Sequence, residues 1–304
     1  MKTKYEYHKD LKLLSKFHFP VIQWLIPIFN FFLGIFYLFQ ISNKRFLVEK
    51  KKIKSKLKEV KFLIYTPKKV KLTNKCLIYI HGGGFAYNSS PHHYKLAKII
   101  GEKICSRIVY INYKLAPRYK FPTPLDDCFS VYNWILDNAN DLNIDINKII
   151  LCGDSAGGNL CANLTNMAFN DNLSVPSHQI LLYPVVTYNI ETDSNKKYTN
   201  VPMCNSKDMK KYSKMYYNHI PNDYIKYLSP LENEIFENYP KTYIEIAEYD
   251  CLHDDGLLMH QKLLESSKES TLIEVEKAMH GYDFMLKSDL VQSLIERRVN
   301  FINK

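Results

Sequence analysis

The chain has 304 residues, 46% of them hydrophobic, and a formal net charge of +10. This length and apolar content exclude a disordered chain and allow one large α/β domain with an insertion. The positive charge lies in residues 1–75, where 18 Lys and Arg face 4 Asp and Glu, so the remaining residues carry 23 minus 27, or −4. We therefore expect no nucleic-acid partner, and the basic charge beside an apolar stretch favours a membrane surface.

That apolar stretch covers residues 17–43, which carry no formal charge and end at Lys44 and Arg45. About 20 apolar residues suffice for a membrane-spanning helix, but Pro20 and Pro27 interrupt a continuous helix. Residues 1–45 are therefore expected to be either a membrane anchor or interfacial helix, or a buried pair of cap helices. We predict membrane association, with the endoplasmic reticulum as a candidate compartment and a cytoplasmic protein as the alternative.

From residue 46 onward the pattern alternates between strands and helices. Residues 46–67 predict a hairpin, and further strands are expected at residues 76–80, 108–112, 149–152, 179–183, 243–247 and 271–276. Helices are expected at residues 125–136, 156–169, 254–266 and 283–302. Such alternation indicates a mostly parallel central sheet flanked by helices on both faces. Residues 46–304 are thus predicted to be one α/β domain, interrupted at about 185–228 by a Tyr-rich helical cap insertion.

The motif Gly153-Asp154-Ser155-Ala156-Gly157 joins an expected strand to an expected helix. Glycine on both sides of Ser155 removes Cβ atoms that would clash in a sharp turn, so the hydroxyl is presented at the sheet edge. A Ser/Gly-rich loop that merely caps a helix is the alternative reading of the pentapeptide alone. With the rest of the chain, Ser155 is predicted to be a nucleophile.

A serine hydroxyl needs a base to take its proton and a third group to orient that base. Among ten histidines, His280 is the best placed, because it follows the last expected strand and so lies at the same sheet edge as Ser155. Asp250, which closes the preceding strand, is the predicted acid. Asp254 and Asp255 open the next helix, where carboxylates commonly serve as caps.

A glycine-rich loop, His81-Gly82-Gly83-Gly84, follows the strand at 76–80. Its glycines allow consecutive amides to point at one spot, so Gly82, Gly83, Gly84 and the Ala156 amide are the expected oxyanion hole. His81 is expected to brace the loop. Such a loop can instead cradle a phosphate, but the chain has no GxGxxG with an acidic partner and no Gly-Lys-Ser/Thr. No cofactor and no metal are expected.

These motifs together resemble the hormone-sensitive-lipase-like family of α/β-hydrolases, which includes the arylacetamide deacetylases. In chain order they are His81-Gly-Gly-Gly-Phe85, Tyr113-Lys-Leu-Ala-Pro117 with Phe121-Pro122, Gly153-Asp-Ser-Ala-Gly157-Gly-Asn, Asp250-x-Leu-x-Asp254 and His280-Gly. The resemblance implies an α/β-hydrolase fold, a triad of the matching serine, aspartate and histidine, and short-chain acyl esters, acyl amides or lipid esters as substrates. Arg118, Cys251 and Tyr282 stand where the family usually has Glu, Pro and Phe.

The expected function is that of a serine carboxylesterase or lipase-like hydrolase, which cleaves short-chain or lipophilic acyl esters through an acyl-enzyme. We expect Phe85 and Tyr282 to bind substrate, and the N-terminal segment and the insertion to line the acyl pocket. Amide or formamide hydrolysis on the same triad is one alternative. A non-catalytic small-molecule receptor, as the plant gibberellin receptors are on this fold, is another, disfavoured because those lack the catalytic histidine and His280 is present.

Overall fold

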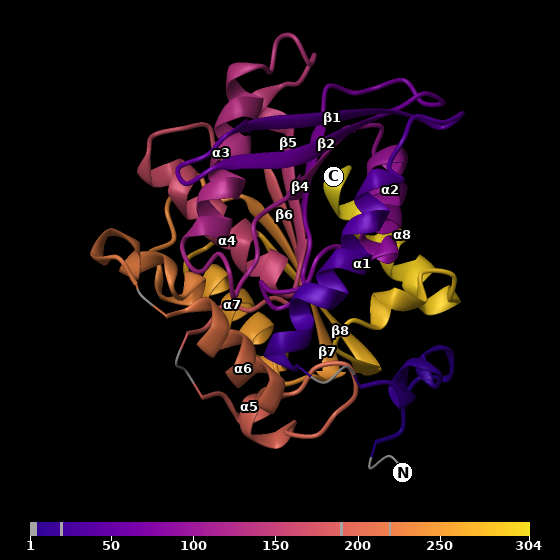
Figure 1. Ribbon diagram of the computed structural model, residues 1–304, viewed down its shortest axis with the longest axis vertical. Coiled ribbons are helices and arrows are strands. Elements are labelled where there is room, and N and C mark those ends of the chain that lie inside the picture. Colours follow the sequence, from indigo (N-terminus) through magenta and orange to yellow (C-terminus); the bar gives the residue numbers. More distant parts are fainter. Residues whose placement is uncertain (1–4, 19–20, 189–190, 219) are drawn as a thin grey trace.

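The computed structural model describes residues 5–18, 21–188, 191–218 and 220–304. In this part of the chain one eight-stranded sheet has the order β1-β2-β4-β3-β5-β6-β7-β8 (Figure 1). The strands are β1 (Phe46–Lys54), β2 (Glu59–Pro67), β3 (Cys76–Ile80), β4 (Arg107–Asn112), β5 (Ile149–Asp154), β6 (His178–Leu182), β7 (Lys241–Tyr249) and β8 (Ser270–Met279). The β1–β2 and β2–β4 pairs are antiparallel and the others parallel, which confirms the predicted sheet and hairpin.

Helices cover both faces of this sheet, as the alternating pattern predicted. The α-helices are α1 (Ile26–Leu38), α2 (Pro91–Lys103), α3 (Thr123–Asp137), α4 (Ala156–Asn170), α5 (Asp193–Lys197), α6 (Ser206–Tyr216), α7 (His253–Glu265) and α8 (Asp289–Ile302). Short 3₁₀ helices occur at Lys9–Leu11, Leu14–Lys16, Gln23–Leu25, Ile146–Lys148, Asn222–Tyr227, Pro230–Glu232 and Tyr282–Met285.

Strand β3 shows why two cores form. Ile78 and Ile80 enter a core shared with α3, α4 and α7, whereas Leu77 and Tyr79 enter a second core shared with α2 and α8. Successive side chains of a strand point to opposite faces, so an apolar run buries both.

The last helix begins later than predicted, at Asp289 rather than at residue 283. Gly281 has φ +70° and is followed by a 3₁₀ turn, and the Ser288 hydroxyl caps α8 by accepting a hydrogen bond from the Val291 amide. A glycine in the left-handed region and a serine cap together place the helix start after the loop.

The segment between β6 and β7 contains α5 and α6, which lie together at one end of the sheet in Figure 1. It contacts the N-terminal residues: the Met203 amide donates to the Phe17 carbonyl over 3.2 Å, and His18 Nε2 lies 3.5 Å from Asp208 Oδ2. The proposed division into residues 1–45 and 46–304, with a cap insertion at about 185–228, remains a prediction.

The apolar N-terminal segment forms one α-helix, α1, of 13 residues. Pro27 lies in its first turn, where proline removes no helical hydrogen bond, and Pro20 falls outside the described residues. Nowhere in the described ranges is a helix both long and apolar enough to cross a membrane. In the described part of residues 5–45, α1 is accompanied by short 3₁₀ helices only, and its Phe31 is 69% exposed. Whether this segment acts as a membrane anchor, an interfacial helix or a cap remains a prediction.

Candidate active site

Four predicted site elements meet at one edge of the sheet. The glycine loop follows β3, Ser155 follows β5, Asp250 follows β7 and His280 follows β8. These strands are parallel, so their carboxyl ends lie at the same edge, where ligand sites of open α/β sheets form.

Ser155 occupies a strained turn between β5 and α4, with φ 54° and ψ −117°. Its amide donates to the Leu182 carbonyl over 2.8 Å, and its carbonyl accepts from the Val185 amide over 3.2 Å. A Cβ on Gly157 would lie 2.8 Å from the His81 carbonyl oxygen, so only glycine lets α4 start this close to the end of β3. The turn therefore has the strand–elbow–helix form that the motif predicted.

Ser155, His280 and Asp250 form a continuous hydrogen-bonded chain. His280 Nε2 lies 2.9 Å from Ser155 Oγ, and His280 Nδ1 lies 2.7 Å from Asp250 Oδ2. The other carboxylate oxygen of Asp250 accepts from the Leu252 amide over 2.9 Å, and the side chain is fully buried. The hydrogen bond from Leu252 and the burial together hold the Asp250 carboxylate in one orientation, facing the imidazole.

The electrostatics of His280 follow from this contact. Burial opposes the charged imidazolium, but the charge and the hydrogen bond of Asp250 outweigh it and raise the pKa of His280 to about 9. The Tyr183 ring packs edge-on against the imidazole at 4.7 Å between centroids. Tyr183 itself is fixed by its hydroxyl, which donates to Asp283 over 2.6 Å. The motifs gave no signal for Tyr183.

The glycine loop bends as glycine alone allows without strain, with φ +112° at Gly83 and +61° at Gly84. A Cβ on Gly82 would lie 2.7 Å from the Asp154 carbonyl oxygen and closer still to its side chain. The loop is thus pressed against the elbow, near the amino end of α4 that begins at Ala156. The oxyanion-hole role of these four residues remains a prediction.

His81 lies where a bracing residue is expected. It is fully buried, stacks on Tyr113 at 4.4 Å and contacts the Gly82 carbonyl through Nδ1 at 2.7 Å. Burial lowers the pKa of His81 to about 3, so the ring is neutral. The Tyr113 hydroxyl in turn donates to the His81 carbonyl over 2.6 Å.

A second buried cluster lies beneath the elbow and was missed from the sequence. Asp154 accepts from the Tyr79 hydroxyl at 2.9 Å and contacts His93 Nε2 at 3.2 Å. Burial opposes its ionisation, but the charge and hydrogen bond of His93 prevail and hold the pKa of Asp154 well below its ordinary value. The three residues come from β5, β3 and α2, and no local motif connects them.

Tyr282, expected to bind substrate, is fully buried on the other side of His280. Its hydroxyl donates to Glu245, which also pairs with Arg298 through Nε at 2.8 Å and Nη2 at 2.5 Å. Both charged side chains are completely buried. These contacts hold Tyr282 against β7 and α8, and its expected contact with substrate remains a prediction.

A cavity of about 540 Å³ lies between the insertion and the loops after β3, β6 and β7. The triad residues are not in its lining, but Val185 and Leu252 in its wall donate to the Ser155 carbonyl and the Asp250 carboxylate. Phe85 is part of its wall, as expected for a substrate contact, and stacks on Tyr216 at 3.8 Å. The described lining residues are Phe85, Val185, Thr187, Tyr188, Glu191, Asn195, Met209, Lys210, Tyr212, Ser213, Lys214, Tyr217, Leu252 and Asp255. None of these described residues comes from the N-terminal segment, and the expected contribution of that segment to the acyl pocket remains a prediction.

The two acidic residues at the start of α7 tie the insertion to the body. The Asp255 carboxylate accepts from the amides of Val186 at 2.9 Å and Thr187 at 3.0 Å, while Asp254 accepts from the Ser194 amide at 2.8 Å. Burial raises the pKa of Asp255 to about 7 against these bonds. These contacts agree with the structural role expected for both residues. Within the described ranges, no group of three or more His, Cys, Asp or Glu side chains is arranged to hold a metal.

Comparison with known proteins shows which families and structures this chain resembles. The profile of a family described as having the alpha/beta hydrolase fold matches residues 77–284. An arylesterase of Saccharolobus solfataricus is 33% identical over 233 residues, covering 76% of this chain and 75% of the relative. Arylacetamide deacetylase of Bos taurus is 26% identical over 285 residues, covering 72% and 71%. The solved esterase of Pyrobaculum calidifontis superposes with a TM-score of 0.83 at 24% identity, covering 98% of each chain.

Proposed function

The chain belongs to the alpha/beta hydrolase fold family, hormone-sensitive-lipase-like branch, and from this premise we propose that it is a serine carboxylic ester hydrolase acting through an acyl-enzyme. The observation that supports this best is the unbroken contact from Ser155 Oγ through His280 to Asp250, at 2.9 Å and 2.7 Å. The names of its relatives, among them an arylesterase and an ethyl acetate hydrolase, agree with ester substrates.

In the proposed mechanism, Ser155 Oγ attacks the acyl carbon while its proton passes to His280 Nε2. The tetrahedral oxyanion is met by the amides of Gly83, Gly84 and Ala156. The intermediate collapses as His280 returns the proton to the leaving alcohol, which leaves the acyl group on Ser155. Water then attacks this ester, gives a proton to His280 and releases the acid, and Ser155 recovers its proton. Asp250 stabilises the imidazolium in both halves.

The cavity under the insertion is a candidate site for the acyl group. Phe85, Tyr188 and Tyr217 provide apolar wall beside charged residues that include Glu191, Lys210 and Lys214, and a volume of about 540 Å³ holds a small to medium acyl chain. The Tyr212 ring lies against the glycine loop, where a Cβ on Gly84 would come within 2.6 Å of it. An aromatic side chain there limits the length of the acyl group that reaches Ser155.

The test is a hydrolysis series over p-nitrophenyl esters of increasing chain length, run with wild type, Ser155→Ala and the surface control Ser293→Ala. We expect Ser155→Ala to lower kcat by about 10⁴-fold or more and Ser293→Ala to leave it unchanged. An organophosphate ester should form one covalent adduct per chain, on Ser155. A folded wild-type protein that neither hydrolyses any ester nor takes up the organophosphate would reject the proposal.

Amide hydrolysis on the same triad is the second candidate, favoured by the similarity to arylacetamide deacetylase. The same constellation cleaves both bond types, so the ratio of kcat/KM for an aryl acetate and the matching aryl acetamide decides between them. We also keep the predicted membrane association as a proposal about where the enzyme works, which concerns helix α1 and not the triad.

A further inference from the structure

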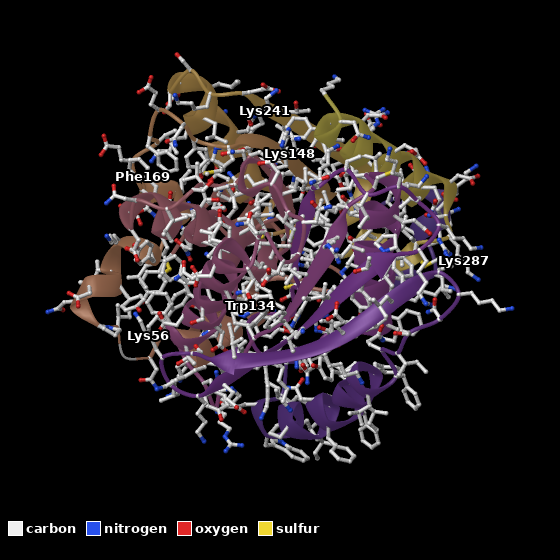
Figure 2. The ribbon with its side chains drawn as sticks, turned by 90° about the horizontal axis from the view of Figure 1, so that it is seen from above. Lys56, Trp134, Lys148, Phe169, Lys241 and Lys287 are labelled. Atoms are coloured by element: carbon white, nitrogen blue, oxygen red, sulfur yellow. The ribbon has the colours of Figure 1, made fainter. Side chains whose placement is uncertain are left out.

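Helix α1 and the 3₁₀ helix before it, Gln23–Leu25, expose a row of large apolar side chains that ends at Phe39, just after α1. This aromatic face consists of Trp24, Ile28, Phe31, Phe32 and Phe39, and each of these side chains is between 49% and 72% exposed. Figure 2 shows α1 as the outermost element beside β1, with its ring side chains extending away from the body. An exposed apolar patch of this kind marks an interaction site rather than a random surface.

The opposite side of α1 is attached to the body. Ile26, Asn30 and Tyr37, spaced by four and seven residues, face inward. Asn30 Nδ2 donates to the Ala86 carbonyl over 2.7 Å, and Asn30 Oδ1 accepts from the Asn88 amide over 2.7 Å. Because these contacts define which way the helix faces, the aromatic face is a fixed part of the folded surface.

A row of lysines adjoins this helix. Lys50, Lys52 and Lys54 alternate along β1 and so share one face of the hairpin, and Lys61 of β2 lies opposite Lys52 on that same face. The one carboxylate among them is Glu59, opposite Lys54, with Oε1 3.2 Å from Lys52 Nζ. The Lys50 ammonium donates to the Leu38 carbonyl over 2.9 Å, which places the row at the end of α1. Residues 44–61 hold 9 Lys and Arg against 2 Glu, a balance of +7. We call these four side chains the lysine face.

We infer that α1 and the β1–β2 hairpin dock on the surface of a bilayer that contains anionic phospholipid. The aromatic face enters the boundary between headgroups and acyl chains, and the lysine face meets the lipid phosphates. Trp and Phe beside Lys are the composition of interfacial helices, and Lys side chains near an anionic surface are attracted to it.

Charge selects the lipid surface over a second copy of this chain. A symmetric dimer through the aromatic faces would bring the two lysine faces toward each other, and like charges oppose such an interface. An anionic bilayer satisfies both the apolar and the basic side chains at once. The docking inference does not depend on the catalytic proposal. Asn30 holds α1 to the segment that follows the glycine loop. A docked protein would therefore keep the catalytic edge of the sheet near the lipid.

Two tryptophans make the docking directly observable. Trp134 packs on Phe62 at 5.0 Å in the body, so Trp134→Phe leaves Trp24 as the single tryptophan, whose emission is followed by selective excitation. Vesicles of phosphatidylcholine with about one third phosphatidylserine should shift Trp24 emission to the blue and co-sediment the protein. Pure phosphatidylcholine vesicles should do so more weakly, and added salt should weaken binding to the anionic vesicles.

Two variants separate the contributions. Phe31→Ser with Phe32→Ser should abolish vesicle binding, and Lys52→Gln, Lys54→Gln and Lys61→Gln together should weaken it about tenfold or more. The matched control is Lys148→Gln, Lys241→Gln and Lys287→Gln; Figure 2 shows Lys148 and Lys241 on the side of the molecule opposite α1. The control should bind like wild type. All variants should keep the circular dichroism, the unfolding temperature and the hydrolysis of a water-soluble ester.

Three results would overturn the inference. Folded wild type that does not co-sediment with anionic vesicles has no such site. Equal binding by wild type and the Phe31/Phe32 variant would place the contact elsewhere. A concentration-dependent dimer without lipid, with Trp24 emission already shifted to the blue, would show that a second copy covers the aromatic face.

Discussion

The catalytic edge of the sheet and the outer side of α1 contrast in where their partners lie. At the catalytic edge, Ser155 and His280 are at most 8% exposed and Asp250 is fully buried, and the contacts that fix the triad come from this chain. On the outer side of α1, Phe31 is 69% exposed. Folding alone completes the first region, whereas the second needs a partner from outside. Substitutions at the edge should therefore cost activity or stability, and those on α1 should cost neither.

The largest expected effect is on the acid of the triad. Asp250→Asn should lower kcat by about 10⁴-fold, because the amide favours the wrong imidazole tautomer. Since the base must be neutral and its pKa is raised to about 9, wild-type kcat/KM should rise with pH and level off above about 9. In the variant the same limb should move to lower pH, and a pH profile of both proteins tests this. An unchanged limb would mean that Asp250 does not set the basicity of His280.

The raised pKa of His280 also makes the stability of the fold depend on pH. The pKa of His280 is raised from about 6.5 to about 9, so its contribution is fully present below the lower value and is lost as pH rises through the higher one. Urea unfolding of wild type between pH 6 and pH 10 should show this loss, and His280→Gln should lack it.

The next effect concerns the buried ion pair behind His280. Arg298→Met leaves the Glu245 carboxylate buried without its cation, which should cost about 3 kcal/mol or more of unfolding free energy. Chemical denaturation measures it. The matched control is Arg45→Met: Arg45 pairs with Glu102 with 59% of its side chain exposed, and the loss should stay below about 1 kcal/mol. If both variants lost the same unfolding free energy, the buried ion pair would matter no more to stability than the exposed one, which contradicts this prediction.

The last two changes compare one glycine from each region. Gly82→Ala places a Cβ 2.7 Å from the Asp154 carbonyl oxygen, so the loop must move and kcat should fall about 10²-fold.

Gly34→Ala in α1 places its Cβ 3.5 Å from Asn88 Nδ2, an ordinary contact. Alanine is the better helix former, so Gly34→Ala should stabilise the protein by about 0.5–1 kcal/mol. Ester hydrolysis and thermal unfolding, both measured on the two variants, distinguish the two effects. A lower unfolding temperature for Gly34→Ala would mean that α1 packs on the body more tightly than its contacts indicate.

Much of the catalytic edge was predictable because its signals are local. Ser155, Asp250 and His280 each directly follow a strand, and parallel strands bring such positions to one edge without any knowledge of long-range contacts. Tyr183 and His93 were missed because they act through residues 100 and 61 positions away, with no motif between them. Pairings of this kind are decided by packing, which no single stretch of sequence records.

The direction in which a side chain points was the second property that the sequence could not predict. Tyr282 follows His280-Gly281 closely enough to suggest a place near substrate, yet its hydroxyl points at Glu245 from a fully buried position. Apolar composition likewise predicted either a membrane anchor or interfacial helix, or a buried pair of cap helices, for residues 17–43. What decides between these outcomes is which face of α1 meets the body, and that depends on Asn30 and the residues at 86–88.

His280 ends β8, the last strand of the chain, which pairs with β7 at the outer side of the sheet. During synthesis Ser155 and the glycine loop leave the ribosome more than a hundred residues before the base does. A partly made or C-terminally truncated chain therefore holds a nucleophile that it cannot activate. Hydrolysis becomes a reporter of completed folding: after dilution from denaturant, activity should return only when β8 has docked on β7, later than the helical signal.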